Sequence, residues 1–245
     1  MPTSDQAICL RTTDYSETSQ VLGLLTRAGG LVRLLAKGSK RPKSTSGGSI
    51  DLFAEGRCVY AGGARESLGT LMEFAESRSH GRLRSGLGRL HAGLHMLELC
   101  GALLAENDPH PEVFDLLHNA LARLDEPDAP APAVLAYFQV RLLKRVGLLG
   151  GLSACAGCGA EPGAGAAFSS AAGGLLCRAC QPAAADRRAV PRAALAGLGV
   201  LAAAEAGRRP AFPDDQARAV TALLDYHVEY QLGRRLRTAR YVGKV

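Results

Sequence analysis

The chain has 245 residues, of which 47% are hydrophobic, and it carries seven cysteines and a net charge of +6. This length is sufficient for one to three domains with buried cores. An uncharged apolar run of about 18 residues is absent, which excludes a membrane-spanning helix, and residues 1–13 lack a secretory signal pattern. We therefore expect a cytoplasmic protein.

Residues 1–79 are predicted to form a β domain. Short segments rich in Leu and Val predict strands at residues 7–12, 19–26, 31–36, 50–54, 56–60 and 68–74. The Gly29-Gly30 pair predicts a hairpin turn between the second and third strands. So many short strands in one small domain favour a barrel, with the OB-fold preferred and an SH3-like barrel as the alternative.

From His80 onward the apolar residues recur every three or four positions, which predicts helices. A first helix follows the leucine stripe from Leu83 to Leu97, and prolines open further helices at Pro111, Pro132, Pro191 and Pro213. The predicted fold is α+β and multidomain. It has an N-terminal OB-fold barrel at 1–79, an α-helical bundle domain at 80–150 and 186–245, and a cysteine module inserted at 151–185.

The inserted module contains two C-x2-C pairs, the most specific chemical signal of the chain. Their four cysteines, at a spacing that lets both pairs bind one tetrahedral Zn²⁺, are Cys155, Cys158, Cys177 and Cys180. Four thiolates complete the coordination shell, whereas a catalytic zinc keeps one position open. We therefore predict one structural zinc ion. The other three cysteines, Cys9, Cys58 and Cys100, lie in apolar stretches and are predicted to be buried.

The sequence offers no set of catalytic residues. It has neither a Gly-rich dinucleotide-binding motif nor a phosphate-binding P-loop. His91 and His95 stand at helical spacing but without a third ligand, and are interpreted as surface or interface histidines. Asp214 and Asp215 fit the positive end of a helix dipole better than an acid/base pair. We expect a protein that is not an enzyme.

Positive charge is concentrated in two segments that contain no acidic residue, which indicates a polyanionic partner. One extends from Arg27 to Ile50 and includes the third predicted strand, and the other follows Glu229 and includes Lys244. The predicted DNA-binding residues are Arg11, Arg33, Lys37, Lys40, Arg41, Lys43, Arg234, Arg235, Arg237 and Arg240. Because residues 1–79 contain few aromatic residues, we expect binding to the DNA backbone, with little sequence preference and strong salt dependence.

Several segments together resemble a known family. They are residues 14–19 (DYSETS), 24–26 (LLT), 33–38 (RLLAKG), 97–99 (LEL), 111–124, 138–147 and 168–177. Over nearly the whole chain they look like the bacterial DNA repair family RecO, although His95 stands where many relatives carry Tyr. The resemblance implies a non-enzymatic, nucleoid-associated recombination mediator of the RecF pathway. It implies binding to single- and double-stranded DNA, strand annealing, contacts with RecR and single-stranded DNA-binding protein, and help in loading RecA.

Two other interpretations remain open on the residues alone. The first is a protein–protein adaptor with weak DNA binding, whose helical domain binds an acidic peptide through Arg141, Lys144 and Arg145. The second is an RNA-binding zinc protein, because OB-folds and zinc knuckles also serve RNA.

Overall fold

The computed structural model describes residues 1–41, 44, 48–62, 68–204 and 213–242. The chain divides into two compact units, which are described separately. The first comprises Met1–Gly86 with Leu97–Pro127, and the second comprises Leu87–Met96 with Asp128–Val245. Within the described residues, no helix combines the length and the apolar character that crossing a membrane requires.

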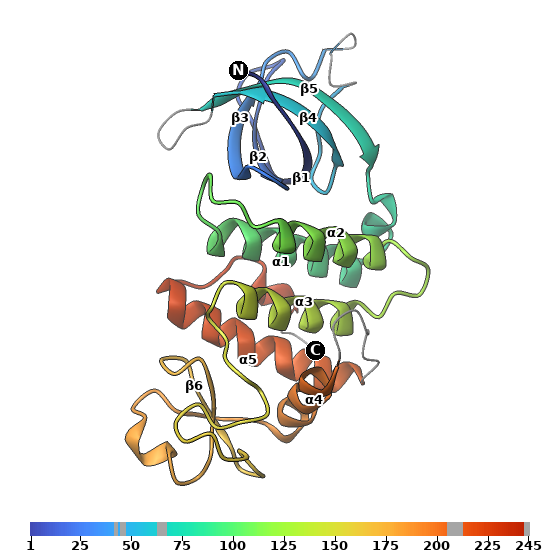
Figure 1. The fold of residues 1–245 in the computed structure, drawn as a ribbon. Coiled ribbons are helices and arrows are strands. Elements are labelled where there is room, and N and C mark those ends of the chain that lie inside the picture. Colours follow the sequence, from blue (N-terminus) through green and yellow to red (C-terminus); the bar gives the residue numbers. More distant parts are fainter. Residues whose placement is uncertain (42–43, 45–47, 63–67, 205–212, 243–245) are drawn as a thin grey trace. The chain divides into compact units, whose positions relative to one another are not determined.

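Five strands close into a barrel in the first unit (Figure 1). They are β1 (Thr3–Asp14), β2 (Gln20–Thr26), β3 (Gly30–Ala36), β4 (Glu55–Ala61) and β5 (Gly69–Arg78). The order around the barrel is β1-β2-β3-β5-β4, with β3 and β5 parallel and the other neighbours antiparallel. This arrangement confirms the predicted OB-fold.

The barrel interior follows the alternation of apolar residues along the strands. Cys9, Leu22, Leu24, Val32 and Leu34 are all fully or almost fully buried. The Gly29-Gly30 turn is confirmed, since Thr26 pairs with Gly30 across the β2–β3 hairpin. Gly30 has φ +74°, and a Cβ there would collide with the backbone of Asp108, so the position requires glycine.

The strand predicted at residues 50–54 is wrong. This segment is a loop in which Ile50 and Phe53 are buried. Its backbone bonds to β1 only at Cys9, which accepts the Phe53 N–H and donates to the Ala54 carbonyl. Phe53 has φ 72°, which interrupts an extended chain. The pattern of apolar residues therefore indicated burial correctly but not the backbone conformation.

The remaining part of the first unit is helical. The predicted first helix is divided at Gly86, which is extended, into a short 3-10 turn η1 (Gly81–Ser85) and α1 (Leu87–Leu103). After a loop, α2 (Pro111–Leu124) begins at the predicted proline and buries an apolar face that includes Val113 and Leu117. A bidentate pair between Arg27 of the β2–β3 turn and Asp115 of α2, with a shortest distance of 2.9 Å, joins helix and barrel.

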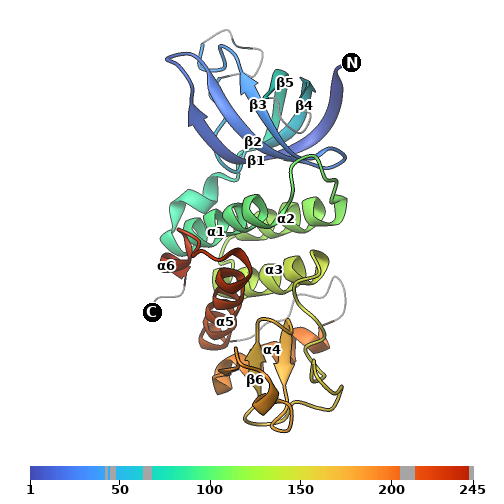
Figure 2. The ribbon, with the colours of Figure 1, turned by 90° about the vertical axis from the view of Figure 1, so that its left-hand side faces the viewer.

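The second unit combines helices with a small sheet. Its helices are the start of α1, α3 (Ala131–Arg145), α4 (Arg192–Ala203), α5 (Asp214–Leu232) and α6 (Ala239–Val242). Gly197 lets α4 approach α5 closely, because a Cβ there would lie 2.8 Å from Val220 Cγ2. The sheet has the order β7-β6-β8 and lies beside α4 and α5 (Figure 2). Its strands are β6 (Ala167–Ser169), β7 (Gly174–Leu176) and β8 (Arg188–Ala189), with a 3-10 turn η2 (Gln181–Ala183) before β8.

The boundaries of the two compact units differ from those of the three predicted domains, at 1–79, 80–150 with 186–245, and 151–185. They group α2 with the barrel, and the cysteine module with α3 to α6. Compactness alone does not test which segments fold independently. The three-domain division therefore remains a proposal.

Candidate metal centre and nucleic-acid interface

The four predicted cysteines converge in the second unit. The Sγ atoms of Cys155, Cys158, Cys177 and Cys180 all lie within 4.8 Å of one another. Cys158 Sγ and Cys177 Sγ are 3.7 Å apart. A tetrahedral ion with metal–sulfur bonds of about 2.3 Å places its sulfurs roughly 3.8 Å apart, so the cluster fits one such ion.

The backbone around the cluster is built for thiolates. The N–H groups of Gly157 and Cys177 donate to Cys155 Sγ at 3.4 and 3.3 Å. These hydrogen bonds, first that from Cys177, lower the pKa of Cys155 to about 6. Hydrogen bonds with the neighbouring sulfurs, first Cys158, raise the pKa of Cys180 to about 12. Four thiols at this spacing thus ionise together only when a cation offsets their charge.

The remaining cysteines are buried as predicted. Cys9, Cys58 and Cys100 are each 0% exposed. Burial raises the pKa of all three thiols to about 12, so none is a reactive thiolate at neutral pH.

Two of the predicted DNA-binding arginines come together on the outside of the barrel. Arg11 of β1 and Arg33 of β3 both pair with Gly23 of β2, which lies between them. Residues directly opposite one another point to the same face of a sheet, and both arginines are exposed. Since neighbouring strands lie about 4.8 Å apart, the backbones of the two arginines are roughly 10 Å apart, with a glycine between them.

The basic loop after β3 is held against the β1–β2 turn by a buried glutamine that the sequence analysis missed. Gln20 Oε1 accepts hydrogen bonds from Ser39 Oγ and from the Ile50 N–H, both at 3.0 Å. Its Nε2 donates to Thr12 Oγ1 and to the Ile50 carbonyl. The only sequence signal was one amide side chain at the start of an apolar strand.

The cations of this loop differ in their surroundings. Lys37 and Arg41 are exposed, whereas Lys40 forms an ion pair with Asp14 at 2.6 Å and its side chain is only 25% exposed. Arg33 lies 3.8 Å from Glu106 but stays largely exposed. Lys43 lies outside the described residues. Lys37 and Arg41 are therefore the loop cations most available to a phosphate.

Of the aromatic residues in the barrel, only Tyr15 is exposed among those the structure describes. Phe53, Tyr60 and Phe74 are buried in the core, while Tyr15 in the β1–β2 turn is 66% exposed. Over its described residues, the barrel surface therefore has one exposed aromatic ring and several exposed cations.

The C-terminal basic run lies in the second unit and is anchored by apolar residues. Leu236, Ala239 and Val242 are buried. Between and beside them, the exposed arginines are Arg234, Arg235, Arg237 and Arg240. Lys244 lies outside the described residues. The run is therefore a structured basic surface over the part that the structure describes.

The predicted partner-binding cations on α3 are partly used within the protein. Arg141 donates to the Ala204 carbonyl at 2.9 Å and lies over the Tyr137 ring. Lys144 is half-buried, and burial lowers its pKa. Arg145 is exposed. Arg145 is thus the most accessible of the three to a partner.

His95 is buried inside the second unit, not on its surface. It is 0% exposed, and its Nε2 donates to Asp225 Oδ1 at 2.8 Å. Gln139 Nε2 donates to the same oxygen, also at 2.8 Å. His91, by contrast, is half-buried and stacks on Tyr241 with ring centroids 4.8 Å apart. A surface position for His95 is therefore excluded, and of the two predicted positions the interface between helices is the one that the structure has.

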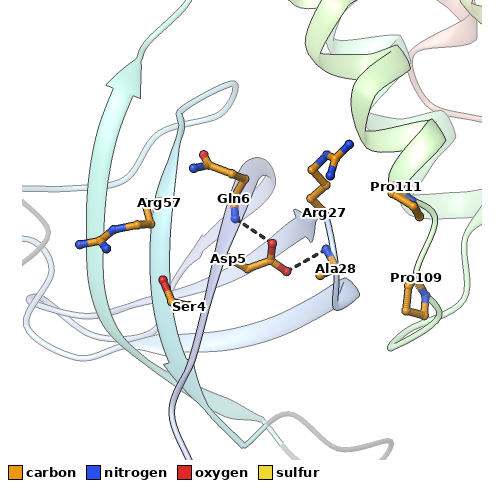
Figure 3. Close-up of a pocket in the computed structure, with 8 residues that line it drawn as sticks. All are labelled: Ser4, Asp5, Gln6, Arg27, Ala28, Arg57, Pro109 and Pro111. Carbon is orange, nitrogen blue, oxygen red and sulfur yellow. Dashed lines mark hydrogen bonds between the residues drawn. The ribbon is translucent and has the colours of Figure 1, made fainter.

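A shallow pocket of about 620 Å³ opens beside β1 and the β2–β3 turn of the first unit (Figure 3). Asp5 lines the pocket, and its carboxylate accepts a hydrogen bond from the Ala28 N–H at 2.9 Å. Arg27 on its rim is held by Asp115, and Arg57 is the other lining cation. The pocket therefore has little free charge to offer a polyanion.

Comparison with known proteins shows which family the chain belongs to. Residues 1–90 match the family profile described as Recombination protein O N terminal, and residues 84–240 match Recombination protein O C terminal. The chain belongs to the RecO family. It is 33% identical to the DNA repair protein RecO of Myxococcus xanthus (strain DK1622), over 98% of this chain and 97% of that protein. It is 35% identical to the DNA repair protein RecO of Anaeromyxobacter sp. (strain K), over 97% and 94%.

Proposed function

We propose that this RecO-family protein is a non-enzymatic recombination mediator in the cytoplasm, associated with the nucleoid. It binds single- and double-stranded DNA and anneals complementary strands. With RecR, it helps to load RecA onto single strands coated with single-stranded DNA-binding protein. Family membership supports the repair role, and the barrel surface supports the DNA contact.

The observation that carries the DNA contact is the pair of exposed arginines on either side of Gly23. A strand laid across the barrel over this glycine meets Arg11 on β1 and Arg33 on β3, with Lys37 and Arg41 beyond β3. Cations on neighbouring strands and loops suit a phosphate backbone, which is how OB-folds hold single strands. Lys40 and, from its place in the sequence alone, Lys43 are included among the proposed DNA-binding residues.

Annealing requires that the repulsion between two phosphate backbones be screened. The barrel surface and the C-terminal arginines, Arg234, Arg235, Arg237 and Arg240, offer two basic regions on one chain. We propose that each holds one strand, so that the complementary bases meet while the charges are neutralised.

We further propose that the metal is one Zn²⁺ with a structural role. Four cysteine sulfurs within 4.8 Å suit a closed tetrahedral site and leave no position for a substrate. The ion would hold together a segment whose strands are only two or three residues long.

The partner contact is proposed for the exposed end of α3. Arg145, with Lys144 and Arg141 beside it, would meet an acidic segment of single-stranded DNA-binding protein or of RecR. If annealing and DNA retention are both absent while partner binding persists, the adaptor interpretation replaces the mediator. Preference for RNA over DNA would favour the RNA-binding alternative.

The test is an annealing assay with labelled complementary oligonucleotides over a salt series, with and without single-stranded DNA-binding protein. Neutralising Lys37, Lys40, Arg41 and Lys43 together should weaken binding and flatten the salt dependence by about 0.7 per lost contact on single strands. Arg123→Ala is the control, because this cation of α2 pairs with Glu126, which follows the helix. If the quadruple variant keeps both affinity and salt slope, the loop is not the DNA site.

A further inference from the structure

A second cavity, of about 310 Å³, lies in the second unit beside α5. Three arginines from different segments line it. They are Arg188 of β8, Arg235 after α5 and Arg240 of α6. Cavities of this size hold small ligands, and three guanidinium groups favour an anionic one.

Arg188 forms a flat platform with Tyr226 of α5. Its guanidinium carbon lies 4.2 Å from the centroid of the Tyr226 ring. The strand that carries Arg188 is fixed, because Arg188 pairs with Phe168 of β6, which is fully buried. A planar cation held on an aromatic ring leaves a face on which a nucleobase can stack.

The other two arginines are also held in place. Arg235 precedes buried Leu236, and Arg240 follows buried Ala239. Between them, Thr238 Oγ1 lies 2.7 Å from His95 Nδ1 inside the unit. The two cations therefore stand on an anchored segment and lose little conformational freedom when an anion binds.

Two acidic residues in the cavity shape its selectivity. Asp225 Oδ1 accepts hydrogen bonds from His95 and Gln139, so this oxygen is already occupied within the protein. Glu229 is exposed and offers an acceptor for the amino group of a base. Three guanidinium groups against two carboxylates leave the cavity positive, with both donors and acceptors.

We propose that this cavity holds one nucleotide of a single strand. The base stacks on the Arg188–Tyr226 platform, and Arg235 and Arg240 bind the adjacent phosphates. The proposal rests on the proposed DNA function and extends it, because it adds Arg188 and Tyr226 and predicts preference for unpaired bases at this site. A base inside a duplex is already stacked on its neighbours and cannot occupy the platform.

The experiment measures binding of the full-length protein to a fluorescent single strand and to its duplex. Arg188→Ala should weaken single-strand binding by about 5- to 150-fold, since stacking contributes about 1–3 kcal/mol per base. Arg188→Lys should give an intermediate affinity, because lysine keeps the positive charge but lacks the planar guanidinium group on which a base can stack. Tyr226→Leu should weaken binding similarly, whereas Tyr226→Phe should stay close to the wild type.

The matched control is Arg187→Ala, which removes a neighbouring charge. Arg187 is exposed and donates to the Ala184 carbonyl at 3.0 Å. The Arg187→Ala variant should bind single strands about as tightly as the wild type. Melting temperatures should show that all variants are folded. If Arg188→Ala and Arg187→Ala behave alike, the proposal is overturned. Equal losses on single strand and duplex would overturn the base contact. Failure of the wild type to bind either DNA would instead sink the proposed function.

Discussion

Nδ1 of His95, in α1, lies 2.7 Å from Oγ1 of Thr238, which directly precedes α6. Nε2 of the same ring donates to Asp225 Oδ1 at 2.8 Å, so both ring nitrogens have a hydrogen-bond partner inside the protein. One buried ring therefore joins α1 to α5 and to the segment that follows α5, both more than a hundred residues away in the sequence. The segment it holds at the C-terminal side carries Arg235, Arg237 and Arg240, so the histidine also fixes a basic surface.

Thr238→Val should destabilise the second unit. Valine has nearly the same shape but lacks the hydroxyl, so His95 Nδ1 would be left without this partner inside the protein. Such a loss costs about 1–3 kcal/mol, and each kcal/mol lowers the melting temperature by about 2–4 °C for a chain of this size. Thermal unfolding measures the effect. Thr238→Ser keeps the hydroxyl and should retain most of the stability; equal losses in both variants would contradict a role for the hydrogen bond.

Gln20→Leu should weaken DNA binding without removing any charge. The leucine fits an apolar strand but cannot bind Ser39 or Ile50, so the basic loop loses its side-chain bonds to β2. The Gly38 N–H to Ser19 Oγ and the Lys40 N–H to the Thr18 carbonyl remain, so the loop is loosened and not released. Lys37 and Arg41 then become more mobile, and holding them on a phosphate costs about 0.5–1.5 kcal/mol for each side chain. Affinity in a salt titration should fall by roughly 2- to 12-fold per side chain.

The salt slope distinguishes this effect from loss of charge. For Gln20→Leu the slope should remain near the wild type, because the same cations contact the DNA. For Lys37→Ala it should fall by about 0.7 on single strands. If Gln20→Leu leaves the affinity unchanged, the glutamine network does not organise the binding surface.

Features that depend on local sequence patterns could be predicted, whereas contacts between residues distant in the sequence could not. The strands, the prolines that begin helices and the cysteine spacing are local patterns, and the barrel and the cysteine cluster were predicted from them. The approach of Arg11 and Arg33 depends on strand register through Gly23, which a single sequence does not specify. The contacts of Gln20 with Ile50 and of His95 with Thr238 span 30 and 143 positions, and no local pattern encodes them.

At residues 50–54 a local pattern was present, but it predicted the wrong backbone conformation. Its apolar residues are buried as a strand's would be, yet Phe53 takes a left-handed conformation. Apolar pattern reports burial, and burial is compatible with several backbone conformations. The same reasoning explains why the leucine stripe from Leu83 did not reveal the interruption at Gly86.

Cys177→Ser should abolish stoichiometric metal binding. The purified protein should contain about one zinc ion per chain, and the variant should contain close to none, because three thiolates and a hydroxyl hold the ion far less tightly. The melting temperature should fall as well. Metal content after denaturation, measured with a colorimetric chelator, tests this directly.

Cys100→Ala is the control for losing a cysteine as such. Cys100 is buried outside the cluster, so this variant should lose some stability through a small cavity and keep its metal. A Cys177→Ser protein with full zinc content would contradict the four-cysteine site. β8 pairs with β6, and β6 pairs with β7, which ends directly before Cys177. Loss of the metal should therefore also weaken single-strand binding through Arg188.

Glu55→Gln should destabilise the first unit in a pH-dependent manner. Glu55 of β4 is buried, and its two carboxylate oxygens lie 3.2 Å from His80 Nε2 and 2.7 Å from His118 Nδ1 of α2. Burial alone would raise the pKa of the carboxyl. The hydrogen bonds and positive charge of the two histidines overcome it and hold the pKa below the ordinary 4.5.

The direction of the pH effect follows from this lowered pKa. The folded state binds the proton of Glu55 more weakly than the unfolded chain, so the contribution is fully present above about pH 5 and disappears as the pH falls through the folded pKa. Urea unfolding should show Glu55→Gln less stable than the wild type by about 1–3 kcal/mol at pH 7, with the difference shrinking below pH 4.5. Glu76→Gln, an exposed neighbour on β5, should change stability little at either pH. A difference between wild type and Glu55→Gln that stays constant down to pH 3 would show that the carboxylate charge is not what stabilises the contact between α2 and the barrel.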